Sequence, residues 1–204
     1  MNAFRRRCKN RYVGKYTVSG GGLIIYDNIG IYCIKERKKD YDVYNDVGGK
    51  YQFEDGDIFA TIAREFAEET YYTCEITRKC VVELLEKEGV KQIYLNNPES
   101  HPVYLCVIVP NILLAKDLRI DANKFKEART KVLENNPTVP TSYYNSLEIC
   151  HVPFTYLKSH ITDHTKINFR LSSILKLWLP DFFSEKNLCD SITKEMKLCT
   201  LSDT

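Results

Sequence analysis

Runs of apolar residues separated by turn residues dominate the N-terminal part of the chain. The run 23–26 (LIIY) is followed by the turn 27–28 (DN) and by a second run over 29–34. This pattern predicts a β-hairpin. A short strand is expected over 12–18, and the glycine triplet at 20–22 is expected to interrupt the strand pattern. Because the apolar runs do not alternate with polar residues, we expect a sheet that is covered on both faces.

The apolar period changes to that of a helix at Ile58. Ile58, Ile62 and Phe66 recur at intervals of four and form one stripe, as in an amphipathic helix. Asp57 has the side chain of a good N-cap and follows an acidic turn at 54–56.

Further elements follow from the same patterns along the rest of the chain. We expect strands over 43–47, 74–76, 91–95, 103–109 and 147–152, a charged loop over 35–44, and helices over 81–87, 121–136 and 167–179, with Pro180 ending the last helix. The final ~20 residues are polar and are expected to dock loosely or to be partly disordered. Alternating strands and helices place the chain in the α/β class.

The amino-acid composition excludes few classes of fold or function. With 204 residues, of which 44% are hydrophobic, the chain is expected to form one domain over 1–204, with its core over 15–179. The net charge of +2 gives no overall nucleic-acid signature. Basic residues do gather in an N-terminal leader (5–15) and in a second cluster at 35–39, where either could meet a polyanion or simply be solvated.

The cysteines point to a reducing compartment. The eight cysteines are scattered, without a CxxC pair, which is unlike a zinc knuckle or a secreted disulfide scaffold. The sequence contains no apolar run long enough to cross a membrane and no secretion signal after the basic leader. We therefore expect a soluble, cytoplasmic protein that has no membrane partner.

The segment 48–72 (GGKYQFEDGDIFATIAREFAEETYY) concentrates the chemistry of the chain. At about 100° per residue, Glu65, Glu68 and Glu69 project from one side of the expected helix. Like charges this close are costly when partly removed from water, unless a cation neutralises them. The three glutamates are therefore candidate ligands of a divalent metal ion, although a short acidic run on its own is equally typical of a solvated helix face.

This segment resembles the Nudix box, written G-x5-E-x7-R-E-U-x-E-E-x-G-U with U a bulky apolar residue. Arg64-Glu65-Phe66, then Glu68-Glu69, and Tyr72 match its second half, and the glycine pair 48–49 resembles its start. The strand and helix start over 147–157 resemble the late part of many Nudix domains. The resemblance implies an α/β/α sandwich with a mixed central sheet.

Three positions depart from the box. Counting back from Arg64 puts Gly56 where the first glutamate belongs, so that Asp57 or Glu54 is the candidate for its role. Tyr71 replaces the glycine that normally ends the helix in a left-handed conformation. An aromatic residue adopts this conformation only at a cost, so the helix end is expected to differ. Val47 stands where a proline often precedes the glycine pair.

The resemblance implies a Mg²⁺-dependent pyrophosphohydrolase, with Mn²⁺ as a substitute metal. By carry-over, Glu65, Glu68, Glu69 and the Gly49 carbonyl hold the metal. Glu65 is also the candidate for activating water, and Arg64 orients the carboxylates. The further candidates are Glu148, as the acidic residue that many members supply from a later loop, and Arg37 and Lys50, as substrate-binding residues.

The substrate and partners stay open at this point. The default is a nucleoside-diphosphate derivative such as an ADP-ribose-like nucleotide. Capped mRNA is the named alternative, because the basic leader and the 35–39 cluster could follow an RNA backbone, and diphosphoinositol polyphosphates would suit the same bases. A Nudix-like binding module with weakened catalysis is the alternative outside the enzyme class. A homodimer is also left open.

Overall fold

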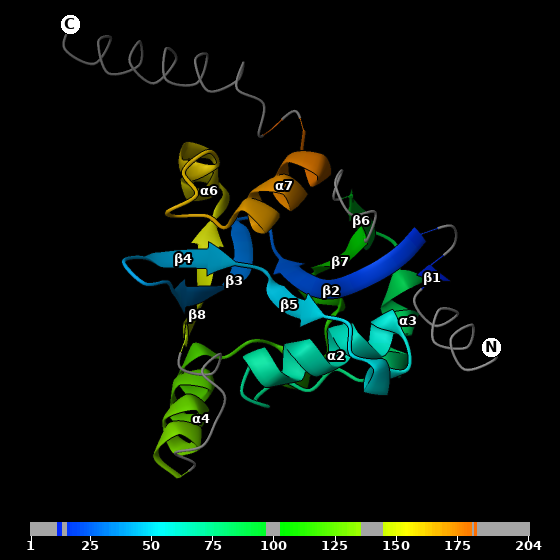
Figure 1. Ribbon diagram of the computed structural model, residues 1–204, viewed down its shortest axis with the longest axis horizontal. Helices are drawn as coiled ribbons and strands as arrows, with labels where there is room; N and C mark the ends of the chain where they lie inside the picture. Colours follow the sequence, from blue (N-terminus) through cyan, green and yellow to red (C-terminus); the bar gives the residue numbers. More distant parts are fainter. Residues whose placement is uncertain (1–11, 14–15, 97–102, 136–144, 181, 183–204) are drawn as a thin grey trace, which may run out of the picture.

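An eight-stranded mixed sheet organises the part of the chain that the computed structural model describes, residues 12–13, 16–96, 103–135, 145–180 and 182 (Figure 1). The strands are β1 (Tyr12–Val13), β2 (Tyr16–Tyr26), β3 (Gly30–Arg37), β4 (Asp42–Asn45), β5 (Val47–Lys50), β6 (Lys91–Asn96), β7 (Val103–Pro110) and β8 (Ser146–Pro153).

Helices cover both faces of this sheet. They are α2 (Ile58–Glu69), α3 (Arg78–Leu85), α4 (Ala122–Asn135), α6 (Phe154–His160) and α7 (Phe169–Trp178), with short 3-10 turns η1 (Phe53–Asp55), η2 (Asn111–Leu113) and η3 (Lys116–Leu118). Figure 1 shows α2, α3 and α4 on one side of the sheet and α6 and α7 on the other.

The long strand β2 is the centre of the sheet. One of its edges pairs with β7 in parallel over most of its length. Its other edge is shared, because β5 pairs with the glycine half of β2 and β3 pairs with its end, both antiparallel. Beyond these, β3 carries β4 and β8, and β7 carries β6. Strand β5 therefore lies in the middle of the sheet, next to α2.

Alternation along the central strands builds two separate cores. On β2, Leu23 and Ile25 pack in the core beneath α2, whereas Ile24 packs in the core beneath α6 and α7. On β7, Val107 and Ile108 divide in the same way, since successive side chains of a strand point to opposite faces. The expected α/β class and the sheet covered on both faces are therefore confirmed.

Three expectations about individual elements are wrong. The glycines at 20–22 do not interrupt a strand, because β2 continues through them. The charged segment 35–44 is largely a hairpin, since β3 extends to Arg37 and β4 begins at Asp42. The segment 74–76 lies in the connection between α2 and α3 and forms no strand, although Cys74 and Ile76 are buried there. The expected helices over 81–87, 121–136 and 167–179 are confirmed with shifted ends.

The glycines of β2 lie opposite the glycine pair of β5. Gly21 faces Gly49 and Gly22 faces Gly48 across the ladder, and together with Gly20 these five residues are called the glycine patch below. A Cβ on Gly21 would stand 2.8 Å from Ile62 Cγ1 of α2. Glycine in a strand interior often marks such a close approach. The patch therefore lets α2 pack directly onto the middle of the sheet.

None of the helices in the described part of the chain has both the length and the apolar composition that a membrane span requires. The final polar segment and, apart from Tyr12 and Val13, the basic leader fall outside the described residues. The single-domain expectation for 1–204 stays a prediction.

Replacing Gly21 with alanine should destabilise the protein. The new Cβ meets Ile62 and, at 3.0 Å, the backbone oxygen of Leu105, and such overpacking typically costs about 1–3 kcal/mol. Urea denaturation should show this loss in G21A, whereas T17A, on an exposed position of the same strand, should stay within about 0.5 kcal/mol of the parent. A G21A protein as stable as the parent would contradict the packing role of the glycine patch.

Candidate active site

Helix α2 begins where the sequence predicts. The Asp57 carboxylate accepts hydrogen bonds from the amides of Phe59 and Ala60 at 3.1 and 2.9 Å, which caps two amides that have no partner within the helix. The apolar stripe through Ile62 and Phe66 is buried against the sheet. Arg64 and Glu68 lie on the more exposed side of α2, whereas Glu65 and Glu69 are turned toward β5 of the sheet.

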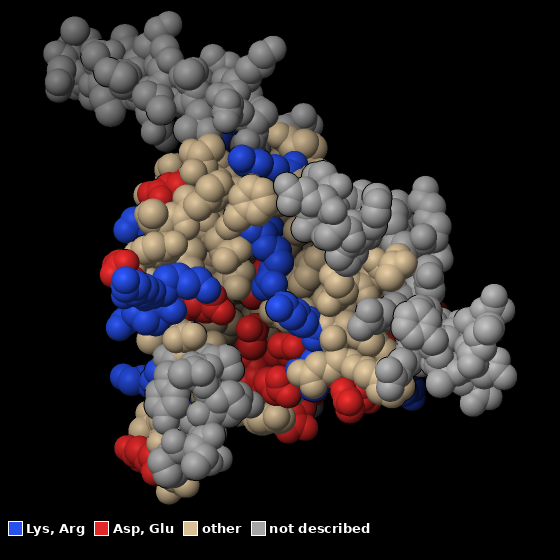
Figure 2. All heavy atoms as spheres, viewed as in Figure 1, with Lys and Arg blue, Asp and Glu red and all other residues tan. Residues whose placement is uncertain are grey.

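These glutamates line a cavity of about 110 Å³ between α2 and the sheet. Figure 2 shows acidic side chains gathered in a hollow over α2, with basic side chains at the tip of the β3–β4 hairpin. The residues lining the cavity are Glu36, Glu65, Glu68, Glu69, Tyr71, Asn145 and Ser146. Four carboxylates therefore face one small space, three from α2 and one from β3.

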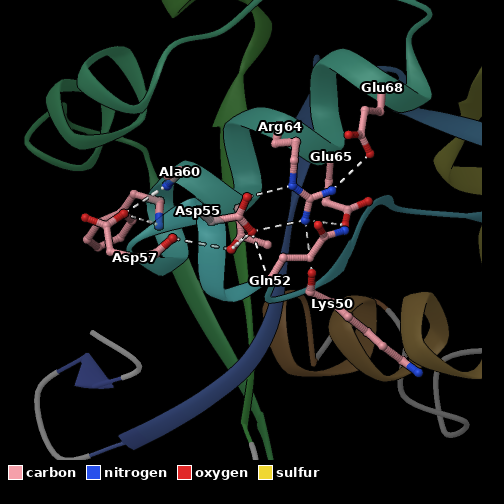
Figure 3. Close-up of polar contacts among 10 residues, drawn as sticks. Lys50, Gln52, Asp55, Asp57, Ala60, Arg64, Glu65 and Glu68 are labelled. Atoms are coloured by element: carbon pink, nitrogen blue, oxygen red, sulfur yellow. Dashed lines mark hydrogen bonds and ion pairs between the residues drawn. The ribbon is translucent and has the colours of Figure 1, made fainter. Parts of the chain in front are cut away.

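Arg64 forms ion pairs with three carboxylates and holds them close together (Figure 3). Its Nη2 lies 2.9 Å from Glu65 Oε1, and its Nη1 donates to Glu68 Oε2 at 2.9 Å. Its Nε donates to Asp55 Oδ1 at 2.7 Å, and Nη2 also reaches the Lys50 carbonyl at 3.1 Å. The expectation that Arg64 pairs with neighbouring carboxylates is confirmed.

In the turn before α2, the carboxylate that bonds Arg64 is that of Asp55, and not that of Glu54 or Asp57, the two candidates from the sequence. Its side chain, only 5% exposed, accepts from Arg64, from the Thr61 hydroxyl at 2.7 Å and from the Gln52 amide at 3.0 Å. Glu54 is exposed, and Asp57 is used as the helix cap. Burial alone would raise the pKa of Asp55, but the hydrogen bonds from these donors outweigh it and lower the pKa.

The reason for the one-residue offset lies in the turn itself. η1 closes a 3-10 turn over Phe53–Asp55, and Gly56 follows with φ 80°, in the left-handed region that glycine adopts without penalty. This turn directs the carboxylate just before Gly56 toward Arg64. Counting back from Arg64 misses that carboxylate, because eight residues and not seven separate Asp55 from Arg64, whereas counting forward from Gly49 through G-x5-E reaches Asp55.

Glu65 owes its position to the glycine patch. A Cβ on Gly49 would stand 2.4 Å from the Glu65 carboxyl carbon, so a residue larger than glycine would displace that carboxylate. The Gly49 carbonyl oxygen lies beside Gly20 of β2, 2.4 Å from where a Cβ of Gly20 would stand. Burial raises the pKa of Glu65, and the Arg64 guanidinium offsets this only in part. The structure thus gives Gly49 a steric role, while its predicted role as a metal ligand stays a prediction.

Glu69 is the most deeply buried of the three glutamates. Its Oε2 accepts a hydrogen bond of 2.7 Å from the Gly48 amide. Burial raises the pKa of Glu69 well above its ordinary value, because the Gly48 amide and the nearby charge of Arg170 compensate only partly, and because Asp46 and Glu36 add negative charge. A carboxylate held in this way is ready to accept a cation or a proton.

Tyr71 keeps the left-handed conformation that the box glycine would have. Its φ is 53°, and that of Tyr72 is 57°, so the expectation of a different helix end is wrong at the level of the backbone. Such a φ costs an L-residue about 1–2 kcal/mol. The Tyr71 ring is 3% exposed and packs edge-on against Phe125, with 5.0 Å between centroids. Its hydroxyl donates to the Ser146 carbonyl at 3.4 Å. Packing therefore offsets the strain.

The structure does not bring Glu148 to the cavity. Glu148 stands opposite Lys35 in the β3–β8 ladder and accepts from its ammonium at 2.8 Å. Because side chains alternate along a strand, the neighbouring Glu36 points to the other face and lines the cavity. Glu36 is paired with Lys38 at 2.7 Å. The acidic residue that joins the three glutamates thus comes from β3, where the sequence analysis had noted only basic residues.

The two substrate-binding candidates also lie outside the lining of the cavity. Arg37 pairs with Asp42 across the β3–β4 hairpin, and its side chain is 58% exposed. Lys50 contributes its carbonyl to Arg64, while its side chain points away from the carboxylates (Figure 3). Their roles in substrate binding stay predictions.

The donor set fits a divalent metal in its chemistry. Among the described residues, no three acidic, histidine or cysteine side chains are arranged so that they could hold a metal ion as they stand. Mg²⁺, however, is usually bound through one or two carboxylates, water and substrate phosphates rather than by an all-protein cage. The cavity supplies carboxylate oxygens of that kind from Glu65, Glu68 and Glu69.

Comparisons with known proteins add little evidence about the function of this site. No protein-family model matches the sequence, and no curated protein does. Among solved structures, a "NUDIX hydrolase from Nitrosomonas europaea" matches with 14% identity and a TM-score of 0.31. The matched part covers 51% of this chain and 66% of that chain, slightly under two thirds of its length. The α/β assignment therefore rests on the sheet and helices themselves.

At position 71, glycine should give a more stable protein than alanine, which is the reverse of their usual order inside a helix. Both Y71A and Y71G lose the ring packing, but only alanine keeps the cost of φ 53°. We expect Y71A to be less stable than Y71G by about 1 kcal/mol in chemical denaturation. At Ala67, inside α2, the order is the ordinary one, so A67G should be about 1 kcal/mol less stable than the parent. Equal stability of Y71A and Y71G would contradict the strain.

Replacing Asp55 and Glu54 by their amides should have very different effects on the stability of the protein. D55N weakens the bonds to Arg64 and Thr61, so its free energy of unfolding at pH 7 should fall by about 1–3 kcal/mol. E54Q should change it by less than about 0.5 kcal/mol.

The pH dependence of this difference follows from the lowered pKa of Asp55 in the folded chain. The stabilisation is present above the unfolded-state pKa of about 4 and is lost as the pH falls through the folded-state value. The gap between the parent and D55N should therefore close below about pH 4 in denaturation curves. A gap that widens with acid would contradict the assignment.

Proposed function

We propose that this protein is a Mg²⁺-dependent hydrolase of the Nudix type that cleaves the diphosphate linkage of a nucleoside-diphosphate derivative. The observation that carries the proposal is the cavity lined by four carboxylates directly beside the glycine pair and Arg64. The sequence resemblance includes Glu65, Glu68 and Glu69 of this lining, together with the glycine pair and Arg64, so motif and geometry support one site.

The residues divide the work according to their surroundings. Glu68 and Glu69 hold the metal, and Glu36 adds a fourth carboxylate from the sheet. Arg64 keeps Glu65 and Glu68 in place through charge-assisted hydrogen bonds. Gly49 leaves room for the Glu65 carboxylate. The whole set is mounted on one capped helix and one strand, which favours a fixed geometry.

Glu65 is the candidate general base that takes the proton of the attacking water. Its carboxylate is largely buried and its pKa is raised, which brings proton acceptance closer to neutral pH. When bound, Mg²⁺ neutralises the diphosphate and lowers the pKa of a coordinated water. Mn²⁺ is expected to substitute for it, since carboxylate oxygens suit both ions.

The basic residues of the β3–β4 hairpin are paired with acidic residues, which favours a small nucleotide over a polyanion as the substrate. Lys35, Arg37 and Lys38 each lie in an ion pair with an acidic neighbour. A phosphate backbone would have to displace those neighbours before these bases could follow it. An ADP-ribose-like nucleotide therefore remains the first choice, with capped RNA and diphosphoinositol polyphosphates as the alternatives.

The proposal is tested by a substrate panel with Mg²⁺ and by three glutamine variants. We expect the protein to hydrolyse ADP-ribose or a related small nucleotide, and E65Q and E69Q to lose activity by about 10²-fold or more. E148Q is the matched control, because Glu148 bonds Lys35 and does not line the cavity, and should keep activity. Thermal melts of all three variants should confirm that they fold.

Each contrary result points to a different error. Full activity in E65Q would overturn the assignment of the catalytic carboxylates. Cap release from RNA without turnover of any small nucleotide would overturn the substrate class. Nucleotide binding without hydrolysis of any member of the panel would favour a binding module in place of an enzyme.

A further inference from the structure

An ion pair between a fully buried aspartate and a half-buried arginine lies immediately behind the candidate active site. The Asp46 side chain is 0% exposed, and its two oxygens accept from Arg170 Nε at 2.7 Å and from the Tyr104 hydroxyl at 2.6 Å. The Arg170 guanidinium carbon also stands 4.5 Å above the Tyr104 ring centroid. Both charges are thus paired and both ends of the carboxylate are bonded, as a buried ion pair requires.

The pair joins three distant parts of the chain. Asp46 precedes β5, Tyr104 belongs to β7 and Arg170 lies in the first turn of α7. Tyr104 can lie there because the glycine patch has no side chains on this face of the sheet: a Cβ on Gly22 or Gly48 would stand 2.2 or 2.3 Å from its hydroxyl.

Arg170 reaches from this pair to the backbone that holds Glu69. Its Nη2 donates to the Gly48 carbonyl at 3.0 Å. The amide of the same Gly48 donates to Glu69 Oε2 at 2.7 Å. Gly48 is therefore fixed on both sides, by Arg170 through its carbonyl and by Glu69 through its amide. Because Gly48 also lies opposite Gly22 in the β5–β2 ladder, these two bonds fix the orientation of a peptide segment that the sheet already holds in place.

We propose that Arg170 is a positioning residue for Glu69, and that it acts through the backbone of Gly48. The inference rests on the proposed function, in which Glu69 is a metal ligand. Arg170 does not contact the metal or the substrate in this role. It sets where the Gly48 amide points and thereby where the Glu69 carboxylate stands. Outer-shell partners of metal ligands typically contribute 10–100-fold to metal affinity or activity.

Arginine, and not merely a positive charge, is required for this role. The planar guanidinium binds Asp46 and the Gly48 carbonyl at once through two different nitrogens. A lysine ammonium is a single point on a flexible stem and can keep the Asp46 pair while releasing Gly48. R170K therefore separates the positioning role from charge neutralisation within the fold.

The experiment is a titration of the full-length protein with Mn²⁺ alone, followed by the electron paramagnetic resonance signal of free Mn²⁺. We expect R170K to bind Mn²⁺ about 10-fold more weakly than the parent or worse, with a melting temperature within a few degrees of it. R78K is the matched control, because Arg78 also pairs with an aspartate through Nε but does so at the N-cap of α2. R78K should bind Mn²⁺ like the parent.

A double variant guards against misfolding. R170M/D46N removes both buried charges together, so it leaves no unpaired charge behind, and it should show the same loss of Mn²⁺ affinity. Parent-like Mn²⁺ binding by folded R170K or by R170M/D46N would overturn the inference while leaving the proposed function intact. A parent protein that neither binds Mn²⁺ nor hydrolyses the panel would overturn the proposed function and the inference with it.

Discussion

The absence of side chains on the glycine patch is the constraint on which the candidate site depends. On the face toward α2, Gly49 leaves space for the Glu65 carboxylate, and on the opposite face Gly48 leaves space for the Tyr104 hydroxyl. Strands β2 and β5 bring these glycines together in register. A strand interior ordinarily loses stability when it contains glycine, so this concentration is most simply explained by the polar groups that lie against it. The centre of the sheet is thus shaped around carboxylates.

Two arginines make that arrangement of carboxylates tolerable. Like charges about 4 Å apart repel by roughly 4 kcal/mol at an effective dielectric constant of 20, and the cavity gathers four acidic side chains. Arg64 compensates Glu65 and Glu68 from the solvent side, whereas Arg170 is bonded to Asp46 and compensates Glu69 only in part, through its nearby charge. Glu69 is left with a backbone amide as its bonded partner in the described part of the chain. With its raised pKa, Glu69 is therefore left to take up either a proton or a cation.

Local sequence patterns predicted α2 well. They did not predict the contacts between residues that are distant in the sequence. The N-cap at Asp57 and the apolar stripe follow from short-range rules, and the structure confirms both. Glu36 and Arg170 could not be found in this way, because strand pairing and helix packing bring them to the site from distant parts of the chain. Glu148 was misplaced for a related reason: which face a strand residue occupies depends on a register that the sequence alone leaves open.

Tyr71 combines a left-handed backbone conformation with a bulky side chain. Tyr71 retains the left-handed turn in which a glycine would have been free of strain, and its buried ring packs against Phe125 of α4. The same ring lines the cavity beside Glu69. A glycine there would end the helix equally well but would leave that wall open. The strained backbone of Tyr71 therefore allows the end of α2 to form one wall of the cavity. Because the Tyr71 ring also packs against α4, the position of α4 affects the shape of that cavity.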